Sequence, residues 1–221
     1  MNRPFFPADA AGSRTIDIPA RPPWIDRGHN ALWLVGALWL ECVIVWLVWY
    51  WGNFADLAFR DPDDAMRLVQ VRDFLAGQSW FDVSQHRVNP PLGGPMHWSR
   101  LVDLPIAAMI LIFRPLAGQA LAEVIACVTV PMMTFAVICF SMFASLRGFL
   151  GNGRALLAIA LLVTTFPILT QLAPLRIDHH GWQITMAVGL LGGMLHPDAR
   201  RGGWIMGLDR KSTRLNSSHR L

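Results

Sequence analysis

The chain has 221 residues, of which 53% are hydrophobic and 15% are charged, and its mean hydropathy is +0.38. This apolar composition favours a membrane protein over a soluble one. The formal net charge of +4 falls to +1 without residues 209–221, which carry four cationic side chains and one acid. So small a charge makes nucleic acid a poor candidate for a partner.

Residues 1–30 are polar and contain prolines and arginines, so we expect a cytoplasmic tail. They do not form a signal peptide, because the apolar span that follows is too long and lacks a small-residue cleavage site. That first span, residues 31–51, contains a single charge, Glu41, and is long enough for a hydrocarbon core of roughly 30 Å. Aromatic residues crowd its end, as in an interfacial belt: Trp46, Trp49, Tyr50 and Trp51.

Three further spans are predicted over residues 122–146, 155–173 and 182–195, the last of them shorter and glycine-rich. Pro131 and Pro167 lie inside two of them. Proline is tolerated in a membrane helix when a neighbour satisfies the carbonyl that it leaves free. The sequence therefore predicts an all-α, polytopic membrane protein with about four transmembrane helices and a long external first loop.

The arginines of the short connections set the expected orientation. They lie in the N-terminal tail and after the second and fourth predicted spans, at Arg147, Arg154, Arg200 and Arg201. The N-terminus is then cytoplasmic, and residues 52–121 and 174–181 are external. We expect an integral protein of a bacterial-type inner membrane, with membrane lipids as partners and a periplasmic active face. The three cysteines, Cys42, Cys127 and Cys139, lie in apolar runs and are interpreted as packing residues.

Two helices are expected within the long loop. Residues 61–76 have apolar side chains at helical spacing, and Gly77 is a natural stop. Leu104 to Phe113 is apolar but too short to cross a bilayer, so we expect an interfacial or re-entrant helix.

The run Asp61-Pro62-Asp63-Asp64 opens the first of these helices. One interpretation is purely structural: Asp61 caps the helix, Pro62 takes its first position, and Asp63 and Asp64 complement the helix dipole. Capping needs one carboxylate and three are present, so one or two of them are also candidate metal ligands. The predicted metal ligands of this run are therefore chosen from Asp61, Asp63 and Asp64.

A second run, Asp178-His179-His180, follows the third predicted span and lies on the same membrane face as the first. It is either a solvated interfacial loop or a source of ligands, a carboxylate and an imidazole, for a divalent metal. We predict that Asp178 binds Mg²⁺ or Mn²⁺ together with Asp61 or Asp63, with His179 as a further candidate ligand. Glu41 either forms a hydrogen bond between helices or serves an ion path.

A turn-rich segment, residues 89–95, leads into His97-Trp98-Ser99-Arg100. Here Arg100 is a candidate for gripping a phosphate, and Trp98 for stacking on a sugar, with His97 beside them. The alternative is that Trp98 and Arg100 anchor the loop at the membrane interface.

The order of these segments resembles membrane glycosyltransferases of the C superfamily, most of all the catalytic subunit of oligosaccharyltransferase. The resemblance is carried by DPDDAMRLVQVRDFLAG, with its acidic start, Arg72-Asp73 pair and Gly77, and by the later Asp178-His179-His180. The second motif departs from that family's Asp-x-Asp at His180. The match covers roughly residues 31–195 in layout and only these two motifs in letters.

The resemblance implies a lipid-linked sugar donor, a divalent metal and catalytic roles for Asp61, Asp63 and Asp178, with an acceptor that the sequence does not identify. A metal held by both loops would neutralise the leaving phosphate as a Lewis acid. The alternative is a membrane transporter or ion-binding protein that uses Glu41 and the Asp178-His179-His180 run. A third alternative is a membrane protein without catalysis, in which the acids only cap helices.

The C-terminal segment reads DRKSTRLNSSH from Asp209 to His219, which matches the translation of a common sequencing adapter. Scars of this kind are excluded from reasoning about the fold. We therefore expect residues 209–221 to be foreign and residues 31–208 to be the N-terminal part of a longer enzyme, inactive as a fragment.

Overall fold

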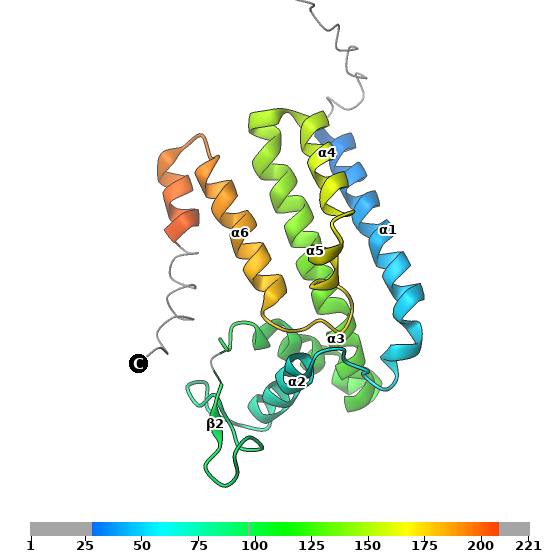
Figure 1. The fold of residues 1–221 in the computed structure, drawn as a ribbon, viewed down its shortest axis with the longest axis vertical. Helices are drawn as coiled ribbons and strands as arrows, with labels where there is room; N and C mark the ends of the chain where they lie inside the picture. Colours follow the sequence, from blue (N-terminus) through cyan, green and yellow to red (C-terminus); the bar gives the residue numbers. More distant parts are fainter. Residues whose placement is uncertain (1–27, 97, 208–221) are drawn as a thin grey trace, which may run out of the picture.

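The structure, a computed structural model, describes residues 28–96 and 98–207. Most of the predicted cytoplasmic tail, His97 and the predicted adapter segment lie outside these residues. The predicted all-α class is confirmed, with one short antiparallel hairpin added. The elements are α1 (Gly28–Phe54), α2 (Pro62–Leu75), β1 (Ser84–Gln85), β2 (Gly94–Pro95), α3 (Asp103–Leu150), α4 (Asn152–Leu162), α5 (Phe166–Thr170) and α6 (His180–Met194), followed by a helix over 199–207 (Figure 1).

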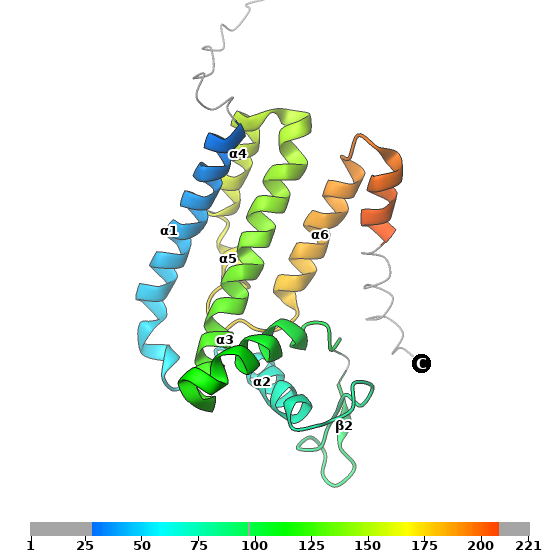
Figure 2. The ribbon, with the colours of Figure 1, turned by 180° about the vertical axis from the view of Figure 1, so that it is seen from behind.

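The long part of α3 lies at the centre of a helix bundle, between α1 and α4 on one side and α6 on the other (Figures 1 and 2). Phe135, Ile138 and Phe143 of α3 are fully buried in the core. The Trp46 ring of α1 packs on Phe135 at 5.2 Å between centroids. Burial of these large side chains is what holds the bundle together.

Two helices of the described residues, α1 and α3, are long and apolar enough to cross a membrane. The 27 residues of α1 extend about 40 Å. Its outward side is apolar, since Trp33, Val48, Trp49 and Trp51 are each at least three-quarters exposed. An apolar surface of this kind is suited to lipid contact. These helices include the first two predicted spans, 31–51 and 122–146.

Neither of the other two predicted spans forms a single helix long enough to cross a membrane. Residues 155–173 do not form one helix, because α4 ends at Leu162 and α5 begins only at Phe166. Pro167 lies in the first turn of α5 and has no backbone N–H, and the Thr165 hydroxyl donates back to the Leu161 carbonyl. The fourth candidate, α6, has 15 residues. A four-span topology therefore stays a prediction.

α3 bends sharply at Gly118, where φ is 76° and ψ is 168°. The part before this bend contains the predicted surface helix, Leu104–Phe113. It lies across the end of the bundle beside α2, and the part after the bend runs into the bundle (Figures 1 and 2). The bend thus separates the surface helix from the long central one.

The helix predicted over residues 61–76 is confirmed as α2. Asp61 is its N-cap, and its carboxylate accepts the Asp63 backbone N–H at 3.0 Å. Pro62 takes the first helical position. The helix ends before Gly77, whose φ of 107° favours glycine. Capping thus uses the carboxylate of one acid of the three and leaves those of Asp63 and Asp64 to be explained.

Pro131 helps to place the loop between α5 and α6. Proline has no N–H for the Cys127 carbonyl one turn earlier. That carbonyl instead accepts the backbone N–H of Leu175 at 3.0 Å. Leu175 adopts a positive φ of 69°, which turns the chain there. The freed carbonyl therefore anchors the segment that carries Arg176 and Asp178 against the first turns of the long part of α3, after its bend.

Candidate functional site

The two acidic runs meet through Asp64. This side chain is fully buried. Its Oδ1 accepts the backbone N–H of Asp178 at 2.9 Å, although the two residues are 114 positions apart. Its Oδ2 accepts Nη1 of Arg176 at 2.8 Å. The structure therefore brings the start of α2 and the loop before α6 into direct contact.

Arg176 joins the two runs more firmly. Its Nη1 also lies 2.9 Å from Oδ2 of Asp61, and its Nη2 donates to Oε1 of Gln171 at 2.7 Å. Burial raises the pKa of Asp64 to about 6, against the opposing charge of Arg176. The Asp63 backbone N–H and Arg176 lower the pKa of Asp61. Asp61, Asp64 and Arg176 thus form one charge-paired unit at the N-terminus of α2.

Asp178 lies at the centre of the second run. It is buried, and both of its oxygens meet imidazoles: Oδ1 lies 2.5 Å from Nδ1 of His179, and Oδ2 lies 2.7 Å from Nδ1 of His180. The two imidazole rings stack with centroids 4.4 Å apart. Burial opposes ionisation of Asp178, but His179 and Arg67 outweigh it and hold the pKa below its usual range.

Among the residues that the structure describes, the side chains of Asp178, His179 and His180 form a group that could hold a metal ion. One ligand atom from each lies within 4.8 Å of the others. His179 and His180 remain partly exposed, with 21% and 41% of their side-chain surface accessible. The sequence reasoning had placed His180 outside the predicted metal set. A mixed set of carboxylate and imidazoles suits a borderline cation such as Mn²⁺ better than Mg²⁺.

Arg67 of α2 was missed by the sequence reasoning. It is fully buried, its Nη1 donates to Oδ1 of Asp103 at 2.8 Å, and its Nη2 lies 3.7 Å from Oδ1 of Asp178. Its guanidinium lies over the Trp98 ring at 4.6 Å. The available signal was helical spacing, because Arg67 follows Asp64 by three positions on the same face of α2.

The predicted substrate-binding residues have mainly internal contacts. Arg100 is buried and donates to Oε1 of Gln78 at 2.8 Å and to the backbone carbonyl of Asp82, so its charge stabilises the loop between α2 and α3. Trp98 is also buried, with its ring 6.3 Å from that of His179. His97 lies outside the described residues.

Asp63 is partly buried beside this unit, at the first turn of α2. Glu41 is exposed on α1, about 20 Å along the helix from the end that faces α2. The alternative of an ion path that uses Glu41 and the Asp178-His179-His180 run stays a prediction.

Comparison of the chain with protein-family models, curated proteins and solved structures gave no match. The function therefore has to be argued from the geometry of the site.

Proposed function

We propose that the chain is part of an integral membrane glycosyltransferase that takes a sugar from a polyprenyl-phosphate-linked donor at the external face. The observation that carries the proposal is the contact between the two acidic loops, in which Asp64 accepts the N–H of Asp178. This contact gathers carboxylates and imidazoles at the end of an apolar helix bundle, next to the surface part of α3. A lipid-borne phosphate would lie at that level of a membrane.

The proposed metal is a divalent cation, with Mn²⁺ favoured over Mg²⁺ by the imidazoles. Asp178 and His179 would hold it, and the geometry adds His180 to the set. Such a cation supplies Lewis-acid neutralisation of a leaving phosphate. Asp61, which keeps 35% of its side chain exposed, and Asp63 are the acids of the first run with access to the site.

The other charged residues of the site hold the proposed metal ligands in position. Asp64 uses both oxygens to hold Arg176 and the backbone of Asp178, so its role is to fix the loop rather than to bind the metal. Arg67 lies behind Asp178 as a buried cation. Together they pre-organise Asp178 to face the two histidines, which lowers the reorganisation needed when a charged ligand enters.

The test has a binding arm and a transfer arm. Mn²⁺ binding to the purified full-length protein is measured by electron paramagnetic resonance, and sugar transfer by the same full-length protein is measured from a radiolabelled polyprenyl-phosphate sugar in membranes. Asp178→Asn is expected to abolish both, while Asp198→Asn, an exposed acid after α6, leaves both unchanged. Transfer that survives both a chelator and Asp178→Asn would refute the proposal.

A further inference from the structure

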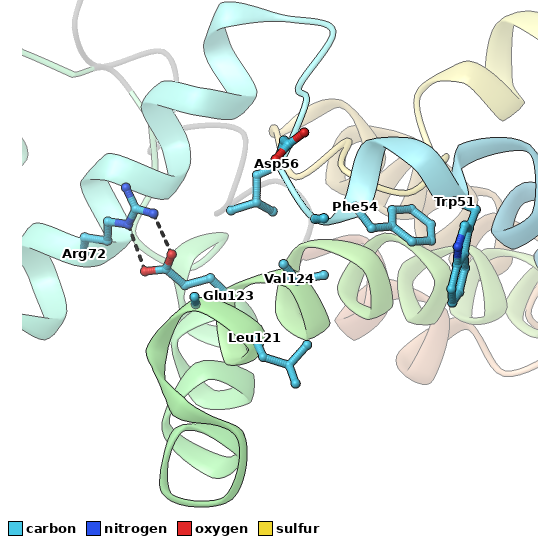
Figure 3. A pocket seen from close by; sticks show the side chains of 10 residues that line it. Trp51, Phe54, Asp56, Arg72, Leu121, Glu123 and Val124 are labelled. Atoms are coloured by element: carbon cyan, nitrogen blue, oxygen red, sulfur yellow. Dashed lines mark hydrogen bonds and ion pairs between the residues drawn. The ribbon is translucent and has the colours of Figure 1, made fainter.

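A cavity lies away from the acidic site, where the end of α1, the side of α2 and the start of the long part of α3 meet. Its volume is about 650 Å³, within the range of small-molecule sites. Apolar side chains supply most of its wall: Trp51, Phe54, Leu57, Leu121 and Val124. Figure 3 shows the pair Arg72 and Glu123 at one end and Trp51 at the other.

The polar end of this cavity is built around a fixed guanidinium. Nε and Nη2 of Arg72 donate to the two carboxylate oxygens of Glu123 at 2.8 and 2.5 Å. Glu123 is 5% exposed and also accepts from Nε2 of Gln119, so its oxygens are already used. Arg72 keeps 48% of its side chain exposed, and its remaining edge, with Nη1, points away from Glu123. The cavity therefore offers hydrogen-bond donors to an acceptor-rich group.

The charges narrow the class of ligand further. Glu123 cancels the charge of Arg72, and Asp56 adds an exposed carboxylate to the lining. A lipid head group with a net negative charge would be repelled by the carboxylate of Asp56. A head group that carries an ammonium beside its phosphate complements both Asp56 and the donors of Arg72. The apolar wall requires a hydrocarbon chain on the same molecule.

The cavity also lies at the right level for such a molecule. Trp51 ends the apolar run of α1 and is three-quarters exposed, as expected of a side chain at a membrane interface. We propose that this cavity binds one zwitterionic phospholipid, with its phosphate at Arg72, its ammonium towards Asp56 and a chain along Leu121 and Val124. This site does not depend on the proposed sugar transfer.

The experiment measures lipid retention by native mass spectrometry. The purified protein is incubated in detergent with equal amounts of phosphatidylethanolamine and phosphatidylglycerol that carry the same acyl chains. We expect one bound phosphatidylethanolamine. Leu121→Trp narrows the apolar part of the cavity, where the chain is proposed to lie, and leaves the Arg72–Glu123 pair in place; it should reduce retention about tenfold, the effect of losing ~1.4 kcal/mol of binding free energy.

The matched control is Leu157→Trp, because Leu157 is similarly exposed, at 60% against 52%, but lies on α4. This variant should retain the lipid as the parent does, and both variants should unfold at the parent's temperature. Asp56→Asn should remove the preference for phosphatidylethanolamine. Equal retention by the parent and Leu121→Trp, no retention by the parent, or a preference of the parent for phosphatidylglycerol would each overturn the proposal.

Discussion

Arg67 connects three separate segments through one buried guanidinium. It lies on α2, pairs with Asp103 at the start of α3, and faces Asp178 before α6. Removing one partner of a buried ion pair leaves the other charge desolvated and uncompensated, which costs far more than the pair contributes. Arg67 therefore helps to compensate both buried acids, together with Arg100 beside Asp103 and His179 beside Asp178.

Replacing this residue tests that role. Arg67→Met keeps much of the side-chain volume but removes the charge, and is expected to cost about 3–5 kcal/mol. The measurement is thermal or denaturant unfolding of the detergent-solubilised protein. Arg87→Gln is the control, because Arg87 is 63% exposed beside Asp73 and should cost less than about 1 kcal/mol. Equal stabilities for the two variants would contradict the buried network.

The residues also show where local sequence is sufficient. The cap at Asp61 was predictable, because the cap, the following proline and the helix all lie within a few positions. The pairing of Arg67 with Asp103, 36 positions away, was not. The sequence neighbours of Arg100 are the same whether its side chain binds a phosphate or a backbone carbonyl of its own loop. The two roles can therefore be distinguished only from the fold.

At the scale of elements, the freed Cys127 carbonyl links α3 to the loop that carries Asp178. In Pro131→Ala the new N–H of residue 131 competes with Leu175 for this carbonyl. Residues 175–178 should then exchange their amide hydrogens faster, as read by hydrogen–deuterium exchange. Pro115→Ala, in the surface part of the same helix, is the control and should leave that loop unchanged. Unaltered exchange in both variants would show that the bond does not anchor the loop.

The bend of α3 depends on one glycine. At Gly118 the backbone occupies a region that only glycine visits readily, and a Cβ there would meet nothing within 4 Å. Gly118→Ala should therefore destabilise the protein by about 1–3 kcal/mol through backbone strain alone. Gly148→Ala, in the same helix with equally open surroundings, should be neutral or stabilising by up to ~1 kcal/mol. Unfolding measurements on the two variants distinguish strain from packing.

The helices were predicted well from the sequence where the hydrophobic pattern and the helix both run without a break, and poorly where the helix is interrupted. α1 and α2 were predicted closely. The third predicted span was not, because an average hydropathy over residues 155–173 does not register the interruption of the helix at residues 163–165. The bend at Gly118 joins a surface helix and a long helix that the sequence treated as separate.

For the whole molecule, the contact between Asp64 and Asp178 constrains the topology. Two residues in hydrogen-bonding contact lie on the same side of any membrane. The chain between them must then cross an even number of times. If the long part of α3 crosses, the segment formed by α4 and α5 has to cross back, although it is broken and neither helix reaches the length of a full span. Its interruption would have to be buried against protein, since lipid cannot satisfy free backbone groups.

Cysteine labelling in intact cells tests this topology. In a background in which Cys42, Cys127 and Cys139 are replaced by alanine, single cysteines are placed at Leu92, in the loop that is predicted to be external, and at Arg154, in the first turn of α4. Both positions are exposed.

With the N-terminus inside, a membrane-impermeant maleimide should label Leu92→Cys and miss Arg154→Cys until the membrane is permeabilised. A third cysteine at Gln171, near the end of α5 beside Arg176, should be labelled from outside if the broken segment returns across the membrane. Labelling of Arg154→Cys in intact cells would mean that the long part of α3 does not cross. Labelling of Gln171→Cys only after permeabilisation would separate Asp178 from Asp64 and remove the basis of the site.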